Sequence, residues 1–298
     1  MYFNAISIGD AVPRTDFDAT IHSVFQSAIN LLLNRGNSLL TLVTSNEADL
    51  PQGIRVDTPA DFSFEMCRTG EPVTCRDDIL RCSFLTIDLR GAGRWKCDLP
   101  SLQADMTNPS VAIAWRHVWQ ALNERQIQSD AEIISENLFR LDETIRVGVS
   151  RKAGEAIRIL FEATRRFDLT AASSLETLIG LGPGLTPAGD DLLMGYMAGL
   201  WCAAKGRSER LNFISALGEI VIRLSKGTND ISRTYLYHAA CGQVSSRLFN
   251  LANAICAGLD LQHVRDCAKS AMQIGHTSGM DAVTGLLFGL AAWDIFPL

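Results

Sequence analysis

The sequence predicts an α+β protein, in which an antiparallel, β-rich N-terminal domain of residues 1–105 is followed by a larger, mainly α-helical domain of residues 106–298. Three observations lead to this expectation. Short β-branched runs fill the first hundred residues, helical periodicity dominates from Pro109 onward, and two glycine-rich loops in the second half each precede an apolar segment. A chain of 298 residues, 47% of them hydrophobic, has enough core material for two domains.

Strands are predicted where apolar and β-branched residues stand between clusters of turn residues. These runs are Ser38–Thr44, Gly53–Asp57, Pro72–Cys75 and Cys82–Leu89. The segment Ile29–Leu33 is typical of the first arm of a hairpin that continues into Ser38 through the turn at 34–37. A helix over His22–Leu33 is the alternative, because the apolar residues there also fit a 3.6-residue period. Periodicity alone does not decide between the two.

Helices are predicted for most of the second half of the chain. Asn108 can cap a helix that has Pro109 at its first position, and an apolar stripe follows from Val111 to Leu122. Similar periodicity predicts further helices over residues 131–146, 151–167, 190–204, 209–225, 231–240, 245–257, 261–273 and 280–293. The strand-like patterns end and the helical patterns begin at Pro100–Pro109, which places the domain boundary near residue 105.

A twelve-residue pattern occurs twice in the helical half. Gly189–Leu200 and Gly279–Leu290 both follow G-x-D-x-x-x-G-x-x-x-G-L. Glycine weakens a helix interior by about 0.5–1 kcal/mol relative to alanine, so the interior glycines need a reason. Close packing against another backbone is the simpler one, and it requires no ligand. It applies to Gly195, Gly199, Gly285 and Gly289.

The loops before the two helices suggest an anion site. Gly180–Ala188 and Gly275–Ser278 are polar, glycine-rich turns, and the prolines of the first loop stiffen it. Such a turn presents backbone N–H groups beside the positive end of a helix dipole, which favours phosphate or carboxylate. The candidate substrate-binding residues of this region are Gly182, Gly184, Thr186, Gly189, Asp190, Ser278 and Gly279.

Two adjacent carboxylates begin the first of these helices. Thr186 is expected to be the N-cap with Pro187 at the first helical position, and capping explains at most one of Asp190 and Asp191. Adjacent helical residues point about 100° apart, so one of them can face a pocket. The repeat selects Asp191, matched by Asp281, and predicts that both line one cavity.

The candidate catalytic residues are Asp191, His276 and Asp281. The two carboxylates would orient an amide or amine, or hold a divalent cation such as Mg²⁺, and no other metal ligands are predicted. His276 would assist proton transfer, with helix capping as the alternative.

Further substrate contacts are predicted outside the two motifs. Thr228 and Ser232 stand in a polar segment where N-capping is the alternative interpretation. The N-terminal segment that contains His22, Ser23 and Asn30 is expected to cover the site.

Several function classes are excluded. With 33 acidic and 27 basic side chains the net charge is −6, which argues against nucleic acid as a partner. The uncharged stretches are shorter than the roughly 18–20 residues of a membrane span, so no membrane association is expected. The eight cysteines show no C-x-x-C spacing and predict reduced thiols in a cytoplasmic protein. Motifs of serine hydrolases, P-loop NTPases, zincins and dinucleotide-binding folds do not occur.

The chain resembles a family that includes the AllH-type subunit of oxamate carbamoyltransferase, which is found with purine and allantoin catabolism. The similar segments are residues 180–200, 275–290, Ile21–Asn30, Leu85–Trp95 and Ile231–Val244. The resemblance implies a cytoplasmic subunit that works with two other polypeptides to move a carbamoyl group between carbamoyl phosphate and oxamate, with oxalurate as the other reactant. The small anionic metabolite and these protein subunits are therefore the expected partners.

Two other functions stay open. A non-catalytic small-anion-binding or scaffold subunit is favoured by the lack of a nucleophile–base pair in the motifs. A Mg²⁺-dependent phosphotransfer enzyme is favoured if Asp190 and Asp191 coordinate a metal.

Overall fold

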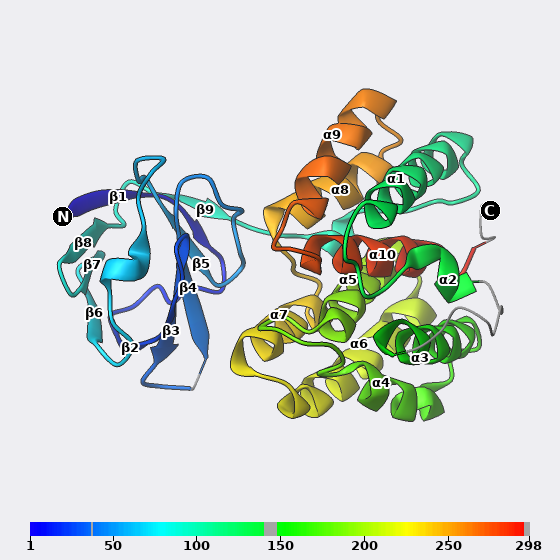
Figure 1. The fold of residues 1–298 in the computed structure, drawn as a ribbon, viewed down its shortest axis with the longest axis horizontal. Coiled ribbons are helices and arrows are strands. Elements are labelled where there is room, and N and C mark those ends of the chain that lie inside the picture. The colour runs from blue at the N-terminus through cyan, green and yellow to red at the C-terminus, as the bar shows by residue number, and fades with distance from the viewer. Residues whose placement is uncertain (37, 140–147, 295–298) are drawn as a thin grey trace. The chain divides into compact units, whose positions relative to one another are not determined.

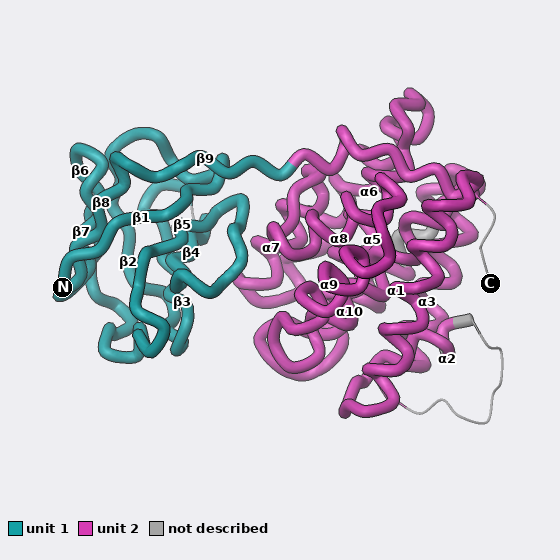
Figure 2. The backbone as a smooth tube through the Cα atoms, turned by 90° about the horizontal axis from the view of Figure 1, so that it is seen from above, with its two compact units in different colours: residues 1–97 teal, residues 98–298 magenta. Residues whose placement is uncertain are grey.

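The structure is a computed structural model that describes residues 1–36, 38–139 and 148–294. The chain forms two compact units, Met1–Cys97 and Asp98–Leu298, each with its own core (Figures 1 and 2). The first unit consists of strands and one short 3₁₀ helix, η1 (Phe64–Met66), and the second is helical.

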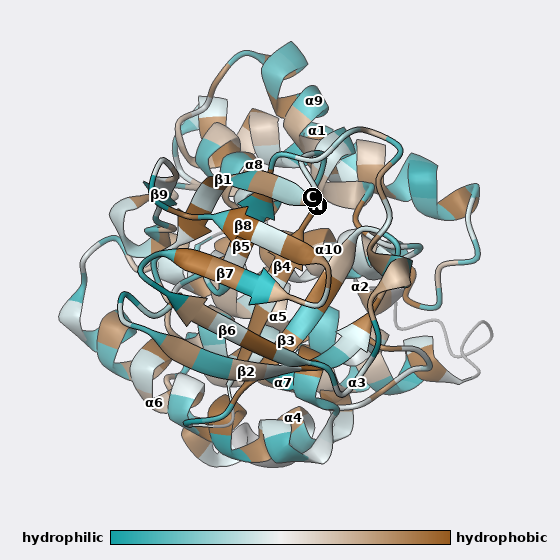
Figure 3. Ribbon diagram, turned by 90° about the vertical axis from the view of Figure 1, so that its left-hand side faces the viewer, coloured by the Kyte–Doolittle hydropathy of each residue, from teal (hydrophilic) through white to brown (hydrophobic). Residues whose placement is uncertain are grey.

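The first unit is one closed sheet. Its strand order is β5-β4-β3-β2-β6-β7-β8-β1-β9, and an additional pairing of β5 with β1 closes it into a barrel. Hydrophobic and hydrophilic residues alternate along several of its strands (Figure 3), as expected when one face fills a barrel interior, whereas β4 is buried at every position. The strands are β1 (Tyr2–Gly9), β2 (Phe17–Val24), β3 (Ala28–Leu33), β4 (Leu39–Val43), β5 (Gly53–Val56), β6 (Pro72–Arg76), β7 (Ile79–Cys82), β8 (Leu85–Asp88) and β9 (Gly93–Trp95).

The predicted α+β class is confirmed, but the prediction of an antiparallel sheet is wrong. β1 pairs in parallel with β8 and β9, and β4 pairs in parallel with β5, so the sheet is mixed. For β1 the reason is topological. The first strand of the chain closes the barrel against strands that come much later in the sequence, and no hairpin fixes their relative direction.

The ambiguity between helix and strand over His22–Leu33 is settled in favour of the hairpin. The predicted hairpin is that of β3 and β4, which pair antiparallel with Leu31 opposite Leu40. β2 also pairs antiparallel with β3, with Ile21 opposite Leu31. The side chains of Ile21, Ile29 and Leu31 are buried in the barrel core, where alternate residues of each strand point inward. A helix here is therefore wrong, because the apolar residues that fit a helical period also fit the alternation of two paired strands.

The second unit is built from ten α-helices among the described residues. They are α1 (Pro109–Ile127), α2 (Ser135–Phe139), α3 (Val149–Arg165), α4 (Ala172–Leu178), α5 (Ala188–Ala203), α6 (Ser208–Leu224), α7 (Asp230–Ala240), α8 (Ser246–Cys256), α9 (Leu261–Met272) and α10 (Ser278–Leu290), with 3₁₀ turns η2 (Leu99–Ser101), η4 (Leu169–Ala171) and η5 (Ser225–Gly227). None of the helices in the described ranges is long and apolar enough to cross a membrane.

Most helices lie where the sequence predicts them. Asn108 caps α1 as expected, because its side chain accepts a hydrogen bond from Ser110 N at 3.0 Å. The helix predicted over 131–146 is represented by the short α2, and residues 140–147 lie outside the described part of the chain. α4 was not predicted.

The central feature of this unit is the contact between α5 and α10, which carry the two copies of the repeat (Figure 1). A Cβ atom added to Gly195 would overlap the carbonyl oxygen of Ala282, and one added to Gly285 would overlap that of Leu192. The later glycines make the same kind of contact one turn further along both helices. The packing explanation of these glycines is therefore confirmed, and the register shows that α5 and α10 run parallel.

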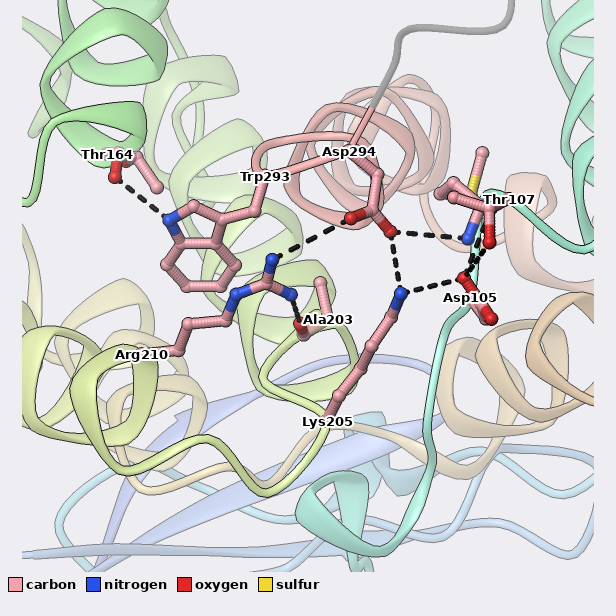
Figure 4. A network of polar contacts seen from close by, with 9 residues as sticks. Asp105, Thr107, Thr164, Ala203, Lys205, Arg210, Trp293 and Asp294 are labelled. Carbon is pink, nitrogen blue, oxygen red and sulfur yellow. Dashed lines mark hydrogen bonds and ion pairs between the residues drawn. The ribbon is translucent and has the colours of Figure 1, made fainter.

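A polar network joins the C-terminal ends of α5 and α10 (Figure 4). Lys205, just after α5, places its Nζ 2.8 Å from an Asp105 oxygen and 2.9 Å from an oxygen of Asp294, which follows α10. Arg210 lies 3.7 Å from Asp294 and stacks on Trp293, 4.9 Å from its ring centre. A cation after a helix C-terminus also interacts favourably with the helix dipole. The opposite, N-terminal ends carry the repeat's carboxylates.

We predict that Gly195→Ala destabilises the protein by about 3 kcal/mol, because the added methyl group meets a backbone carbonyl that cannot move away cheaply. Gly227→Ala is the matched control in the same unit, since its Cβ would lie 3.6 Å from Ile179, an ordinary contact. The control should change the free energy of unfolding by about 0.5 kcal/mol or less. Urea denaturation of both variants measures the difference, and equal effects would contradict the packing argument.

Candidate functional site

The two glycine-rich loops meet at one end of the helical unit. Because α5 and α10 run parallel, their first turns lie side by side. The hydroxyl oxygens of Thr186 and Ser278, one from each loop, are 2.7 Å apart. The repeat thus places two similar helix starts next to each other, and the positive ends of both dipoles point the same way.

Asp191 and Asp281 are the matched carboxyl groups of these two helix starts. Both are buried, with exposed fractions of 5% and 0%. One oxygen of Asp191 and both oxygens of Asp281 have no hydrogen-bond partner among the residues that the structure describes. The hydroxyls of Ser278 and Thr186 interact with Asp191. We call Asp191 and Asp281 the acid pair.

Burial makes both members of the acid pair poor acids. Burial raises the pKa of Asp281 to about 9, and the negative charges of Asp191 and Glu132 act in the same direction. The Thr277 hydroxyl acts against them. Burial also raises the pKa of Asp191 well above its usual range, against the opposing effect of its hydroxyl neighbours. Burial therefore favours the protonated form of both groups, in which each carboxyl group offers one O–H donor and one C=O acceptor.

Asp190 lies in a different environment from the acid pair, because both of its carboxylate oxygens have hydrogen-bond donors. Its carboxylate accepts hydrogen bonds from Gly180 N at 2.8 Å and from the Thr228 hydroxyl at 2.6 Å. Asn229, beside Thr228, caps α7 and donates to the carbonyl oxygen of Leu185 at 2.9 Å. The Ser232 hydroxyl lies 3.4 Å from the same oxygen. Asp190, Thr228 and Ser232 thus hold the first loop against the start of α7.

The first loop has the conformation that its glycines permit. Gly182 and Gly184 have φ angles of 107° and 95°, in the region that favours glycine. Within the described ranges, the N–H groups of Gly182, Gly184, Leu185 and Thr186 find no acceptor in the chain. This run of unused donors, interrupted only by Pro183, is the part of the loop suited to an anion.

Gly189 and Gly279 have their N–H groups engaged inside the protein. Gly189 N donates to Leu181 O at 2.8 Å, and Gly279 N donates to Ile274 O at 2.9 Å. A Cβ at either position would overlap a backbone carbonyl of the preceding segment. In the structure these two glycines allow close packing at the helix starts.

The prediction of Thr186 as the N-cap is wrong by one residue. Pro187 is the N-cap, α5 begins at Ala188, and the Pro187 carbonyl accepts from Asp190 N at 2.9 Å. The Thr186 hydroxyl bonds to Ser278 across the two loops, so it does not cap its own helix. Asp190 and Asp191 still lie in the first turn.

The contacts described above do not include the other predicted residues. His276 is exposed in the turn before α10. His22, Ser23 and Asn30 belong to β2 and β3 of the other unit and form a polar cluster there. In it the Ser23 hydroxyl is 3.1 Å from His22 Nδ1 and 3.0 Å from Asn30 Nδ2. Their participation in a substrate site stays a prediction.

Sequence reasoning missed Glu132, in the segment before α2. A Cβ at Gly182 would lie 3.1 Å from Glu132 Oε2, so this carboxylate lies against the first loop. Its charge also raises the pKa of Asp281. Glu132 belongs to no motif, and only the folded chain brings it to the acid pair. Across the described residues, no group of three or more His, Cys, Asp or Glu side chains is arranged to hold a metal ion.

Fold and site define a two-unit α+β protein whose helical unit contains a paired glycine-rich motif with two buried acids. The chain belongs to the AllH family. Residues 178–290 match the family model described as oxamate carbamoyltransferase subunit AllH, and residues 4–94 match the AllH family N-terminal domain. The first match spans both copies of the repeat, and the second lies within the barrel unit. No solved structure matches the chain.

We predict that Asp281→Asn stabilises the protein at neutral pH by about 2–4 kcal/mol. The pKa of Asp281 is raised from 3.8 to about 9 in the folded state. The folded state binds this proton more tightly than the unfolded state does. The stability that the wild-type protein gains from the bound proton is therefore fully present below about pH 4 and is lost as the pH rises toward 9. Urea denaturation measures the free energy of unfolding of both proteins. The difference in favour of the variant should grow between about pH 5 and about pH 8.

Asp266→Asn is the control for this experiment, because Asp266 is exposed on α9. Its effect should stay within about 0.5 kcal/mol at both pH values. An Asp281→Asn variant no more stable than wild type, or with an advantage independent of pH, would show that the acid is not held neutral by burial.

Proposed function

We propose that this chain is a subunit of a carbamoyltransferase that acts on oxamate and carbamoyl phosphate, or on a closely related small anionic substrate. The description of its family supports this proposal. The structural observation that carries it is the buried acid pair beside a loop with unused N–H groups. The proposal includes a cytoplasmic location and a role in purine and allantoin catabolism.

The reaction explains why the acid pair and the unused N–H groups of the first loop are both needed. The amide nitrogen of oxamate attacks the carbamoyl carbon, the carbon–oxygen bond to phosphate breaks, and the amide proton leaves with the phosphate. Both reactants carry a carboxamide-like end and an anionic end. The acid pair offers donors and acceptors for the former, and the N–H groups of Gly182–Thr186 suit the latter. Positioning of the two reactants is the expected contribution of this chain.

The chain is proposed to work with other protein subunits. The family description names a subunit, and the acid pair is surrounded by carboxyl and hydroxyl groups rather than by an activated nucleophile. The same surroundings of the acid pair also favour the second candidate function, a non-catalytic subunit that binds a small anion. Phosphotransfer through Mg²⁺ is less favoured, because Asp190 already accepts two hydrogen bonds from Gly180 and Thr228.

We expect the purified chain alone to transfer carbamoyl groups slowly or not at all, and activity to appear when the products of neighbouring genes are added. Enzymes typically turn over at roughly 1–1000 per second. The measurement is oxalurate formation from oxamate and carbamoyl phosphate. Turnover in that range by the chain alone would refute the dependence on partners, and no turnover with any partner would refute the carbamoyltransferase proposal.

Substitution in the first loop tests anion binding. Phosphate or carbamoyl phosphate should raise the melting temperature of wild type by mass action. Gly184→Ala should remove this shift, because alanine is strained at a φ of 95° and the loop backbone must change. Gly206→Ala is the matched control, with a φ of 65° and equally open space around its Cβ.

Both glycine variants should lose about 1 kcal/mol of stability from backbone strain. Only Gly184→Ala should lose the ligand-dependent shift. If both variants respond to the anion as wild type does, the loop is not its binding site.

A further inference from the structure

The acid pair has hydrogen-bonding capacity that the protein itself does not use. Both oxygens of Asp281 and one oxygen of Asp191 are buried without a partner among the described residues. A buried polar group without a partner typically costs about 1–3 kcal/mol. Two such groups lie at the start of two helices that pack on each other along their whole repeat. The folded chain retains this unfavourable burial, which is expected where a ligand supplies the missing hydrogen-bond partners.

The chemistry of the pair restricts that ligand. A protonated carboxyl group presents a donor and an acceptor side by side, and a primary carboxamide presents the complementary acceptor and donor at the same spacing. The two groups can pair through two hydrogen bonds at once. A carboxylate offers acceptors only, so it can form one of these bonds and leaves the acid's C=O unmatched.

Two further carboxyl groups act on the acid pair, Asp190 on Asp191 and Glu132 on Asp281, and they strengthen this selection. Glu132 lies against the first loop, beside Gly182, and its negative charge acts on Asp281. The charge disfavours a second anion near the pair and favours the protonated state of Asp281. A divalent cation would need several ionised ligands, and no suitable group of side chains occurs in the described ranges.

We propose that the acid pair Asp191–Asp281 receives the primary carboxamide end of a small substrate and that Glu132 excludes a carboxylate from this end. The anionic end of the substrate then faces the N–H groups of the first loop. The site thereby distinguishes a carboxamide from the carboxylate of the same shape. This inference rests on the proposed function only for the choice of oxamate as the probe.

Oxamate and oxalate test this inference, because they have nearly the same shape and differ by an NH₂ group in place of an oxygen, which gives oxalate one more negative charge. Calorimetry with the full chain, and again with the chain assembled with its partner subunits, measures the affinity for each. Oxamate should bind wild type at least about tenfold more tightly, a typical cost of one mismatched hydrogen bond. Equal affinities, tighter binding of oxalate, or no binding of either in both preparations would overturn the proposal.

Variants of Asp281 separate a neutral acid from an ionised one. Asp281→Leu removes both the donor and the acceptor and should lower the affinity for oxamate by about tenfold or more. Asp281→Asn is an isostere of the protonated acid, with one donor group and one acceptor, and should recover most of that loss. If Asn binds oxamate as poorly as Leu while both variants melt cooperatively, Asp281 acts as an anion and the proposal is wrong.

Glu132→Gln tests the exclusion of carboxylate. It removes the charge and keeps the size, so the affinity for oxalate should rise and the preference for oxamate should narrow by several fold. An unchanged preference would remove Glu132 from the proposal. Binding and turnover are measured separately, so the two ideas can fail separately. Selective oxamate binding without carbamoyl transfer overturns only the proposed function, and transfer without selective binding overturns only this inference.

Discussion

The contact between the backbones of α5 and α10 is the constraint on which the helical unit depends. Glycines at the same positions of both copies of the repeat allow each helix to lie against the carbonyl groups of the other. Gly195 and Gly285 leave no room for a side chain, so the register of the two helices is fixed by atoms that cannot rotate away. The same register brings Asp191 beside Asp281. The glycines of the motif therefore allow the two helices to pack closely, and this packing positions the two acids.

The two ends of this helix pair are stabilised differently. At the C-terminal ends, Lys205 and Asp294 form close ion pairs within a network that is satisfied by the protein. At the N-terminal ends, the acid pair keeps oxygens that have no partner in the described chain. Unfavourable burial of this kind persists only where the surrounding packing more than compensates for it. Tight contact along α5 and α10 offers that compensation, which links stability to the candidate site.

Local sequence patterns were sufficient for much of this architecture and insufficient for its long-range features. Alternation and helical periodicity located most strands and helices, and the shared spacing of the repeat singled out the acid pair. The direction of β1 against β8 is not encoded by any short pattern, because the two strands meet only when the barrel closes. Glu132 has no motif, and Thr186 forms its hydrogen bond with a loop 92 positions away. Predicting these contacts requires the folded register of α5 and α10, which periodicity does not supply.

The electrostatics of the site restrict what the acid pair could contribute to the proposed carbamoyl transfer. Carbamoyl phosphate loses a phosphate, and positive charge near the leaving group is an effective way to stabilise that step. The side chains that act on the acid pair are all acidic or neutral, and they are Glu132, Thr186, Asp190, Thr277 and Ser278. Surroundings of this kind suit a neutral carboxamide and oppose a concentration of negative charge. Under the proposed function, stabilisation of the phosphate therefore falls to groups other than the side chains around the acid pair.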